Sequence, residues 1–158
     1  MISVRPARRE DVRTLARFRA GLWPEDSEVG HRLEVDRFFE GSAPEPLAIL
    51  VADDVGRAVG FAELSIRPWA EGCVTNRVAY LEGWFVAPEA RGRGVGRALV
   101  AAAEEWAVAQ GCKELASDTQ PDNEGSAAAH RALGFTDVGL VRCFRKDLRE
   151  METKGGTT

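Results

Sequence analysis

The chain has 158 residues, of which 44% are hydrophobic and 29% are charged, values typical of one globular domain with one core. Its formal net charge of −4 at pH 7 argues against a nucleic-acid partner, which would need a basic surface. No run of the sequence approaches the roughly 20 apolar residues that a membrane-spanning helix requires, and the N-terminus lacks the apolar stretch of a signal peptide.

The cysteines indicate a reducing compartment. Cys73, Cys112 and Cys143 form no CxxC pair, so their spacing predicts neither a metal site nor a redox motif. An odd and sparse cysteine count suits the cytosol, where disulfides are rare. We therefore expect a cytoplasmic protein that holds no metal and binds neither nucleic acid nor a membrane.

The N-terminal third predicts one strand followed by two helices. Residues 2–6 alternate between apolar and polar side chains, which is typical of a short strand. Apolar residues at spacings of three and four predict helices over residues 11–22 and 27–39. In the second of these helices, Val29 and Leu33, together with Val35 or residues 36–39, are expected to face the core.

The middle of the chain predicts three strands. Residues 47–52 and 58–66 are apolar runs on either side of a turn, which indicates a hairpin. Residues 68–76 predict an exposed loop that carries Trp69. Residues 78–86 predict a third long strand, which ends before Pro88 because proline cannot donate to a sheet.

The C-terminal part alternates between helices and strands. We expect a helix over residues 94–110, a strand over 112–117, a helix over 124–133 and a last strand over 136–146. Hairpins followed by βαβ units imply an α/β (α+β) fold, in which helices cover both faces of a mixed central sheet. Residues 1–148 are expected to form a single domain, and residues 149–158 a flexible tail.

A glycine-rich loop links the third long strand to the helix that follows. It reads Arg91-Gly92-Arg93-Gly94-Val95-Gly96. Glycines let backbone N–H groups approach an anion closely, and the N-terminus of a helix adds unpaired N–H groups and a positive dipole end. The loop therefore predicts a pyrophosphate site, and the alternative is a glycine-rich turn without a ligand.

The spacing of this loop distinguishes it from two other phosphate-binding loops. Gly96 is followed by Arg97-Ala98 and not by the Lys-Ser/Thr of a Walker loop, and Arg97 also stands where a dinucleotide fingerprint needs its third glycine. The pattern is instead similar to the acetyl-CoA signature of the GNAT acetyltransferase superfamily. Asn123, His130 and Gly134-Phe135 resemble a second element of that superfamily.

Several segments resemble one branch of the superfamily, the aminoglycoside 6′-N-acetyltransferases. They are Leu22-Trp23-Pro24 and residues 62–67, 79–86, 116–118 and 130–135. The resemblance covers nearly the whole chain. It implies that residues 1–148 form a GNAT domain, that acetyl-CoA is the co-substrate, that an aminoglycoside is acetylated on its 6′ amine, which gives antibiotic resistance, and that the protein is a homodimer.

The resemblance and the loop together give a set of residues that we expect to contact the cofactor. They are Trp84, Phe85, Val86, Arg91, Gly92, Arg93, Gly94, Val95, Gly96, Arg97, Asn123 and His130. Backbone N–H groups near Phe85 and Val86 are expected to hold the acetyl oxygen as it gains charge.

Two carboxylates are candidates for the acceptor side. Glu82 lies within a mostly apolar strand, where a carboxylate is costly unless it has a partner or a task. It is expected to take the proton of the attacking amine, and the alternative is an ion pair with Arg67 or Arg77. Asp118 ends the next strand, where it is expected to hold the amine or, alternatively, to cap a turn.

Aromatic residues are candidates for lining the sugar site. The resemblance implies that Trp23 lines the acceptor site, and the alternative is a core tryptophan. Trp69 is expected to close over the substrate or to contact a second subunit. Trp84 is expected on the same face as Glu82, and simple packing is its alternative.

His130 stands where many GNAT enzymes have tyrosine. It is expected either to protonate the departing CoA thiolate or merely to contact the cofactor. Two other functions remain open from the sequence. One is acetylation of another small amine, a polyamine or a protein N-terminus, and the other is a non-catalytic acetyl-CoA sensor.

Overall fold

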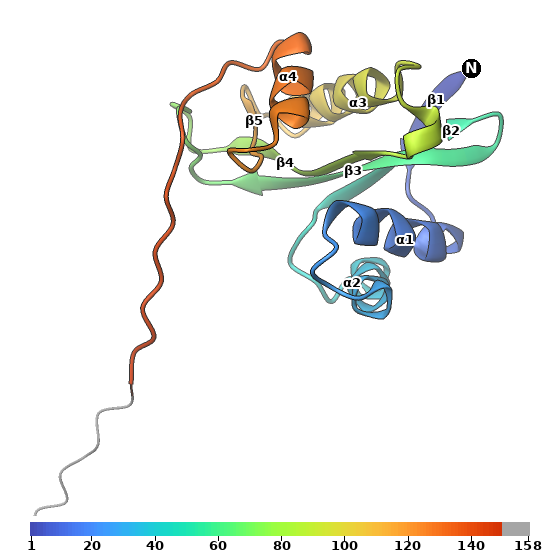
Figure 1. The fold of residues 1–158 in the computed structure, drawn as a ribbon, viewed down its shortest axis with the longest axis horizontal. Coiled ribbons are helices and arrows are strands. Elements are labelled where there is room, and N and C mark those ends of the chain that lie inside the picture. The colour runs from blue at the N-terminus through green and yellow to red at the C-terminus, as the bar shows by residue number, and fades with distance from the viewer. Residues whose placement is uncertain (150–158) are drawn as a thin grey trace, which may run out of the picture.

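A five-stranded mixed sheet forms the centre of the protein in a computed structural model, which describes residues 1–149 (Figure 1). The strand order is β1-β2-β3-β4-β5, with antiparallel pairs from β1 to β4 and a parallel pair between β4 and β5. The strands are β1 (Ile2–Pro6), β2 (Ala48–Asp54), β3 (Arg57–Arg67), β4 (Val78–Val86) and β5 (Leu115–Ser117). Apart from Arg149, the predicted tail lies outside the described residues.

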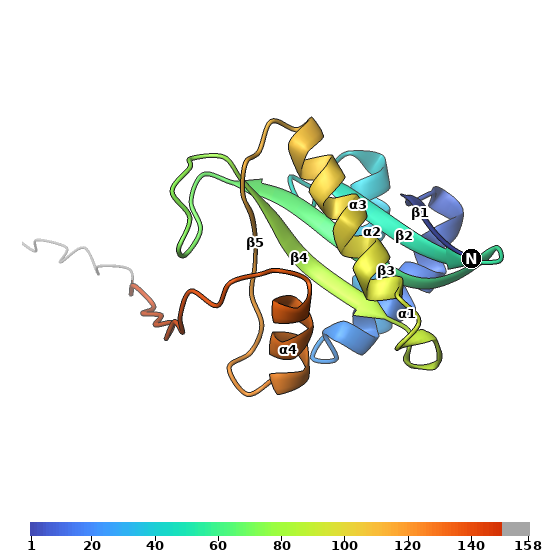
Figure 2. The same ribbon diagram turned by 90° about the horizontal axis from the view of Figure 1, so that it is seen from above.

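Helices cover both faces of the sheet, which confirms the predicted fold class. Helices α1 (Val12–Leu22) and α2 (Glu28–Glu40) lie below the sheet in Figure 1, while α3 (Val95–Ala109) and α4 (Glu124–Ala132) lie above it. Short 3-10 helices precede α1 and follow β4, at Arg9–Asp11 and Pro88–Ala90. Seen from above, α3 crosses the strands as the connection that brings β5 parallel to β4 (Figure 2).

The core lies between the sheet and these helices. On the α1/α2 face, the Phe18 ring lies 6.3 Å from Phe61 and 5.4 Å from Phe85. On the α3/α4 face, the fully buried Val95 and Leu99 of α3 pack in the same hydrophobic cluster. Burying apolar side chains of this size contributes about 1.5–3 kcal/mol each, so the two layers are held mainly by apolar contacts.

Helix α2 differs from its prediction. Val29 and Leu33 are 70% and 53% exposed, while His31 is buried together with Val35, which was expected to face the core. The reason is that α2 packs mainly against α1, so only a narrow stripe of its surface is covered. A buried histidine, His31, completes that stripe in place of the expected Leu33.

Strand β4 has the predicted bounds but contains a β-bulge. Glu63 pairs with Gly83 and Leu64 pairs with Leu81, so Glu82 has no partner on β3. An extra residue in one strand reverses the alternation of its side chains. Tyr80 therefore faces α1 and α2, and Trp84 faces α3 and α4.

Strands β4 and β5 pair over only three residues. The pairs run from Ala79↔Leu115 to Leu81↔Ser117, and none follows Leu81. Beyond this point, the edge of β4 from Glu82 to Val86 has no neighbouring strand within residues 1–149. This unpaired edge of β4 leads directly to the glycine-rich loop.

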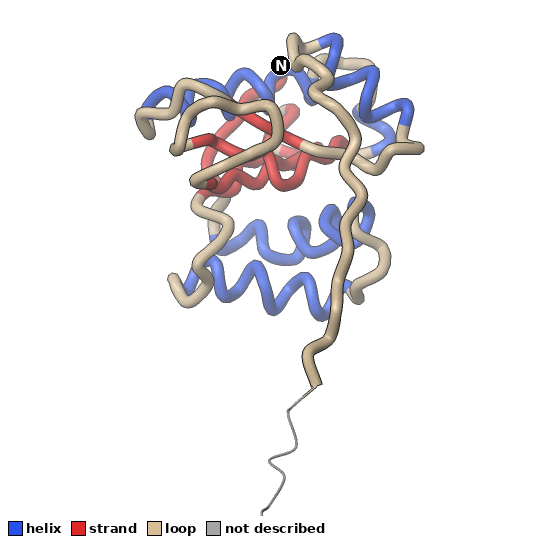
Figure 3. The backbone as a smooth tube through the Cα atoms, turned by 90° about the vertical axis from the view of Figure 1, so that its left-hand side faces the viewer, coloured by secondary structure: helices blue, strands red, loops and turns tan. Residues whose placement is uncertain are grey.

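The predicted last strand at residues 136–146 is wrong for this chain. Residues 135–149 form neither helix nor strand, and they run away from the sheet (Figures 1 and 3). Gly134 and Gly139 have positive φ angles of 92° and 127°, and the chain leaves β5 there instead of returning along its edge. A segment without a neighbouring strand has no ladder of hydrogen bonds and is not a strand.

Among the helices of residues 1–149, none has the length and apolar character needed to cross a membrane.

Candidate active site

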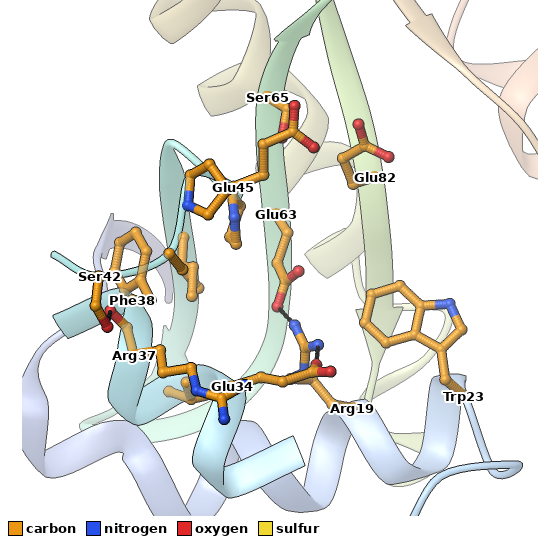
Figure 4. A pocket seen from close by; sticks show the side chains of 15 residues that line it. Arg19, Trp23, Glu34, Arg37, Phe38, Ser42, Glu45, Glu63, Ser65 and Glu82 are labelled. Atoms are coloured by element: carbon orange, nitrogen blue, oxygen red, sulfur yellow. Dashed lines mark hydrogen bonds and ion pairs between the residues drawn. The ribbon is translucent and has the colours of Figure 1, made fainter. Parts of the chain in front are cut away.

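A cavity of about 730 Å³ opens on the α1/α2 face of the sheet. Its walls come from α1, α2, the α2–β2 connection, β2, β3 and β4 (Figure 4). Four glutamates and two arginines line it: Glu34, Glu45, Glu63, Glu82, Arg19 and Arg37. The lining therefore carries more carboxylates than guanidinium groups, which favours a cationic ligand.

Glu82 lies at the bulge and lines this cavity, as its predicted acceptor-side role requires. Arg67 donates to both carboxylate oxygens, from Nε at 2.9 Å and from Nη2 at 2.7 Å. The ion-pair partner is thus Arg67, whereas Arg77 donates to the carbonyl of Gln110. A carboxylate has about four lone-pair sites, so Glu82 can still accept a proton or an ammonium hydrogen bond.

Asp118 is connected to Glu82 through two side chains. The Tyr80 hydroxyl donates to Asp118 Oδ2 at 2.5 Å, and the Arg67 guanidinium lies 3.5 Å over the Tyr80 ring. Burial and the Asp118 carboxylate raise the pKa of Tyr80, so its hydroxyl stays a donor. Asp118 does not itself line the cavity, and it lies behind Tyr80 at the end of β5.

The two candidate tryptophans differ in position. Trp23 follows α1 and lines the cavity, where its ring lies so close to β4 that a Cβ on Gly83 would come within 2.7 Å of it. The structure thus brings Trp23 and Glu82 together. Trp69 is 62% exposed in the loop after β3 and is not part of the cavity.

The glycine-rich loop lies at the N-terminus of α3. Gly92 and Gly94 have φ angles of 76° and 84°, which side chains rarely allow, and the space around both is open. Arg91 donates from Nε to the Val86 carbonyl at 3.0 Å, and Arg93 pairs with Asp54. The first-turn N–H groups of a helix have no acceptor within it, so the loop can bind a pyrophosphate.

Gly96 serves a different purpose from the other two glycines. A Cβ at this position would lie 3.1 Å from the Trp84 ring, so the start of α3 packs directly on that tryptophan. Trp84 Nε1 is buried without a hydrogen-bond partner in the described residues. The bulge thus puts Trp84 beside the loop and away from Glu82, which corrects the expectation that both share one face.

Phe85 and Val86 end β4 beside the loop. The Phe85 side chain packs on the α1/α2 face, so only its backbone faces the unpaired edge of β4. The side chain of Val95, the first residue of α3, is buried in the core, whereas Arg97 on the first turn of the same helix is exposed. The backbone, more than these side chains, is therefore available to a ligand between the loop and β4.

His130 lies on α4 against the unpaired edge of β4. Its ring is 5.1 Å from Trp84, and its Nδ1 lies 2.7 Å from the Ser126 carbonyl. A carbonyl only accepts, so Nδ1 carries a proton, and Nε2 faces the Ser117 hydroxyl at 2.9 Å. Asn123 caps the same helix by accepting from the Ser126 N–H at 3.0 Å.

The sequence interpretation missed a buried ion-pair cluster beside the cavity. Arg19 of α1 pairs with Glu63 of β3 and with Glu34 of α2, and its guanidinium lies 4.8 Å over the Trp23 ring. The available signal was that Glu63 interrupts an apolar strand, as Glu82 does. The helical partners of that carboxylate depend on how α1 and α2 pack, which their sequence spacing does not reveal.

Comparison with known proteins agrees with this fold. The acetyltransferase (GNAT) family matches residues 15–135. An aminoglycoside N(6′)-acetyltransferase type 1 from Klebsiella aerogenes is 51% identical over 146 residues, which cover 92% of this chain and 96% of the relative. The chain therefore belongs to the acetyltransferase (GNAT) family, and within it groups with the aminoglycoside N(6′)-acetyltransferases.

Solved structures show the same likeness. AAC(6′)-Iy in complex with the bisubstrate analog CoA-S-monomethyl-acetylneamine superposes with a TM-score of 0.85 at 36% identity, covering 94% of this chain and 99% of that one. The 6′-N-acetyltransferase AAC(6′)-IG from Acinetobacter haemolyticus gives a TM-score of 0.84 at 34% identity, covering 93% and 99%.

We expect Gly94→Ala to weaken binding of CoA about tenfold, because a positive φ strains any side chain at the position where the loop must present its N–H groups. Gly111→Ala is the matched control, since Gly111 has a φ of 80° and open space at the far end of α3. Calorimetric titration with CoA measures the effect. Equal affinities in the two variants would contradict the role of the loop.

Proposed function

We propose that the protein uses the two faces of β4 to bring a CoA thioester and a cationic amine together. It is an N-acetyltransferase that transfers acetyl from acetyl-CoA to the 6′ amine of aminoglycosides. The observation that carries the acceptor assignment is the glutamate-lined cavity with Trp23 and Glu82, set against the glycine-rich loop on the other side of the strand. The names and bound analog of the relatives support it.

Acetyl-CoA fits the α3/α4 side of this arrangement. Its pyrophosphate matches the N–H groups of Gly92 to Arg97. Its extended arm matches the unpaired edge of β4, where Trp84, His130 and Asn123 lie close by. This direction of binding brings the thioester carbonyl near the backbone N–H groups of Phe85 and Val86, which would hold its oxygen as charge develops.

Glu82 is the base in the proposed reaction. The acceptor amine arrives mostly protonated, and Glu82 takes its proton directly or through water. The neutral nitrogen attacks the thioester carbonyl, an N–C bond forms, the C–S bond breaks and the thiolate leaves. Asp118, which lies behind Tyr80 outside the cavity, would hold a part of the acceptor that extends beyond the cavity by charge-assisted hydrogen bonds, and Trp23 supplies a flat wall for a sugar ring.

His130 is the proposed source of the proton for the thiolate. Its neutral form can only accept at Nε2 from Ser117, so the donating species is the imidazolium. The Ser117 hydroxyl lies between the ring and the end of β4–β5 pairing, where it can pass the proton on. Trp69 stays a proposed contact to substrate or to a second subunit.

Neomycin and paromomycin provide a direct test, because the second carries a hydroxyl in place of the 6′ amine of the first. We expect steady release of CoA thiol with neomycin and at least a hundredfold less with paromomycin, since loss of the nucleophile removes the reaction. A host that expresses the chain should likewise resist kanamycin-type drugs with a free 6′ amine. Equal rates for the two drugs would place the acetylated amine elsewhere, and no rate with either would refute this acceptor class.

Glu82→Gln is expected to lower kcat/KM for neomycin at least a hundredfold, a size typical of a lost general base. Glu104→Gln, on the exposed face of α3, is the control. Normal turnover in a Glu82→Gln enzyme would leave Glu82 as an ion-pair partner of Arg67 only.

We also propose that residues 1–148 act as one acetyltransferase domain, that the enzyme works in the cytoplasm and that it is a homodimer. Leu140 and Phe144 are 80% and 88% exposed on the segment that leaves the fold after α4. The outer edge of β5 has no strand beside it in residues 1–149. A second copy can supply that strand, and Val138 directs the segment by packing against Gly72 of the Trp69 loop.

Leu140→Ser combined with Phe144→Ser should convert the dimer to a monomer, because both apolar side chains lose their burial in the partner. Light scattering coupled to size exclusion measures the mass, with Val29→Ser and Leu33→Ser on the exposed side of α2 as the control pair. A wild-type chain with the mass of one copy would refute the dimer.

A further inference from the structure

A second polar wall of the cavity has no task in the reaction described above. It is formed on β3 by Glu63 and Ser65, which are almost completely buried and line the same cavity as Glu82 (Figure 4). Two residues apart on one strand, they point to the same face of the sheet. Strands β3 and β4 are neighbours at a spacing of about 4.8 Å, so the distance from this wall to Glu82 is no more than the width of one sugar ring.

The carboxylate of Glu63 is fixed in position, but only one of its two oxygens has a hydrogen-bond partner in the described residues. Arg19 pairs with its Oε1, and the second oxygen has no hydrogen-bond partner in the described residues. Arg19 also pairs with Glu34, which is half-exposed on the cavity wall. One guanidinium thus serves two carboxylates. Burial raises the pKa of Glu63, and a second cation beside it would favour its charged form, as Arg19 does.

Arg19 is itself held in place. Its Nε lies 3.4 Å from Nδ1 of the buried His31, and Nε2 of that ring lies 2.9 Å from the Trp23 carbonyl. A carbonyl only accepts, so Nε2 carries the proton and Nδ1 accepts from Arg19 in the neutral ring. The cluster therefore presents Glu34 and Glu63 in a fixed geometry.

Ser65 adds a second, independent indication of a ligand. Its side chain is 0% exposed, and its Oγ has no hydrogen-bond partner within residues 1–149. Buried hydroxyls are nearly always paired, and an unpaired one on a cavity wall marks a place where a bound molecule completes the pairing.

We infer that Glu63, Glu34 and Ser65 form a second subsite, which binds an additional ammonium group and a neighbouring hydroxyl of the acceptor. This inference rests on the proposed function and extends it. Glu82 serves the amine that is acetylated, while the β3 subsite selects acceptors that carry at least two amines. An ammonium can donate to the free oxygen of Glu63 and to Glu34, and a sugar hydroxyl can pair with Ser65 Oγ.

Calorimetric titration of the enzyme–CoA complex tests the subsite without turnover. The ligands are kanamycin, which has several amines, and methyl 6-amino-6-deoxyglucoside, which has one. Glu63→Gln should raise the Kd of kanamycin at least tenfold, about 1.4 kcal/mol, and Ser65→Ala about threefold. Neither substitution should change the Kd of the one-amine sugar by more than about twofold.

Steady-state rates give the second readout, in which Glu63→Gln raises KM for kanamycin and leaves kcat within about threefold. Glu28→Gln is the matched control, since Glu28 starts the same helix as Glu34 outside the cavity. Unchanged kanamycin affinity in a folded Glu63→Gln enzyme would overturn the inference, as would an equal loss for both ligands. If Glu63→Gln does not fold, the Kd values of Glu34→Gln and Ser65→Ala for kanamycin and for the one-amine sugar test the inference in the same way.

The outcome is distinguishable from failure of the proposed function. A wild-type enzyme that acetylates neither ligand would refute the function, while the binding titration would still measure the subsite. A wild-type enzyme that acetylates kanamycin, with variants that bind it normally, would refute the subsite alone.

Discussion

The β-bulge at Glu82 is the constraint on which the arrangement of the site depends. Because Glu82 has no partner on β3, the side chains of β4 exchange faces at this point. Tyr80 stays with Arg67 and Asp118, while Trp84 turns to the glycine-rich loop and His130. A regular strand would place Tyr80, Glu82 and Trp84 together, and the acceptor cavity and the loop would then compete for one face.

The end of β4–β5 pairing acts together with the bulge. Pairing stops after Leu81, one residue before the bulge, so the strand that carries Glu82 also has a free edge beside it. Its backbone can then bind one substrate while its side chains contact the other. In the proposed reaction, the two substrates meet at Glu82 without either having to pass through the core, which stays closed around Phe61 and Leu99.

Sequence reasoning found the elements that depend on local chemistry. The bounds of β4 and the strand–loop–helix order follow from neighbouring residues, and the structure confirms them. Sequence reasoning failed where contacts between segments far apart in the chain decide the structure. A period of two cannot reveal a bulge, so Trp84 was expected on the face of Glu82. The burial of His31 and the identity of the side chains that pair with Glu63 depend on how α1 packs on α2.

The last expected strand failed for a related reason. Residues 136–146 contain several apolar side chains that suit a strand, but a strand also needs a neighbour, and the described part of one chain offers it none. The ion pair of Glu82 shows the opposite case. The sequence left Arg67 and Arg77 open, and pairing of β3 with β4 decides for Arg67.

The contact between Gly96 and Trp84 has a consequence for how this sequence can vary. Gly92 and Gly94 are glycines because of their backbone angles, whereas Gly96 is a glycine because an indole ring occupies the space of its side chain. The two positions are twelve residues apart and belong to different elements. A larger residue at 96 becomes acceptable only when the residue at 84 becomes smaller, so in evolution or in a mutant library the two positions should change as a pair.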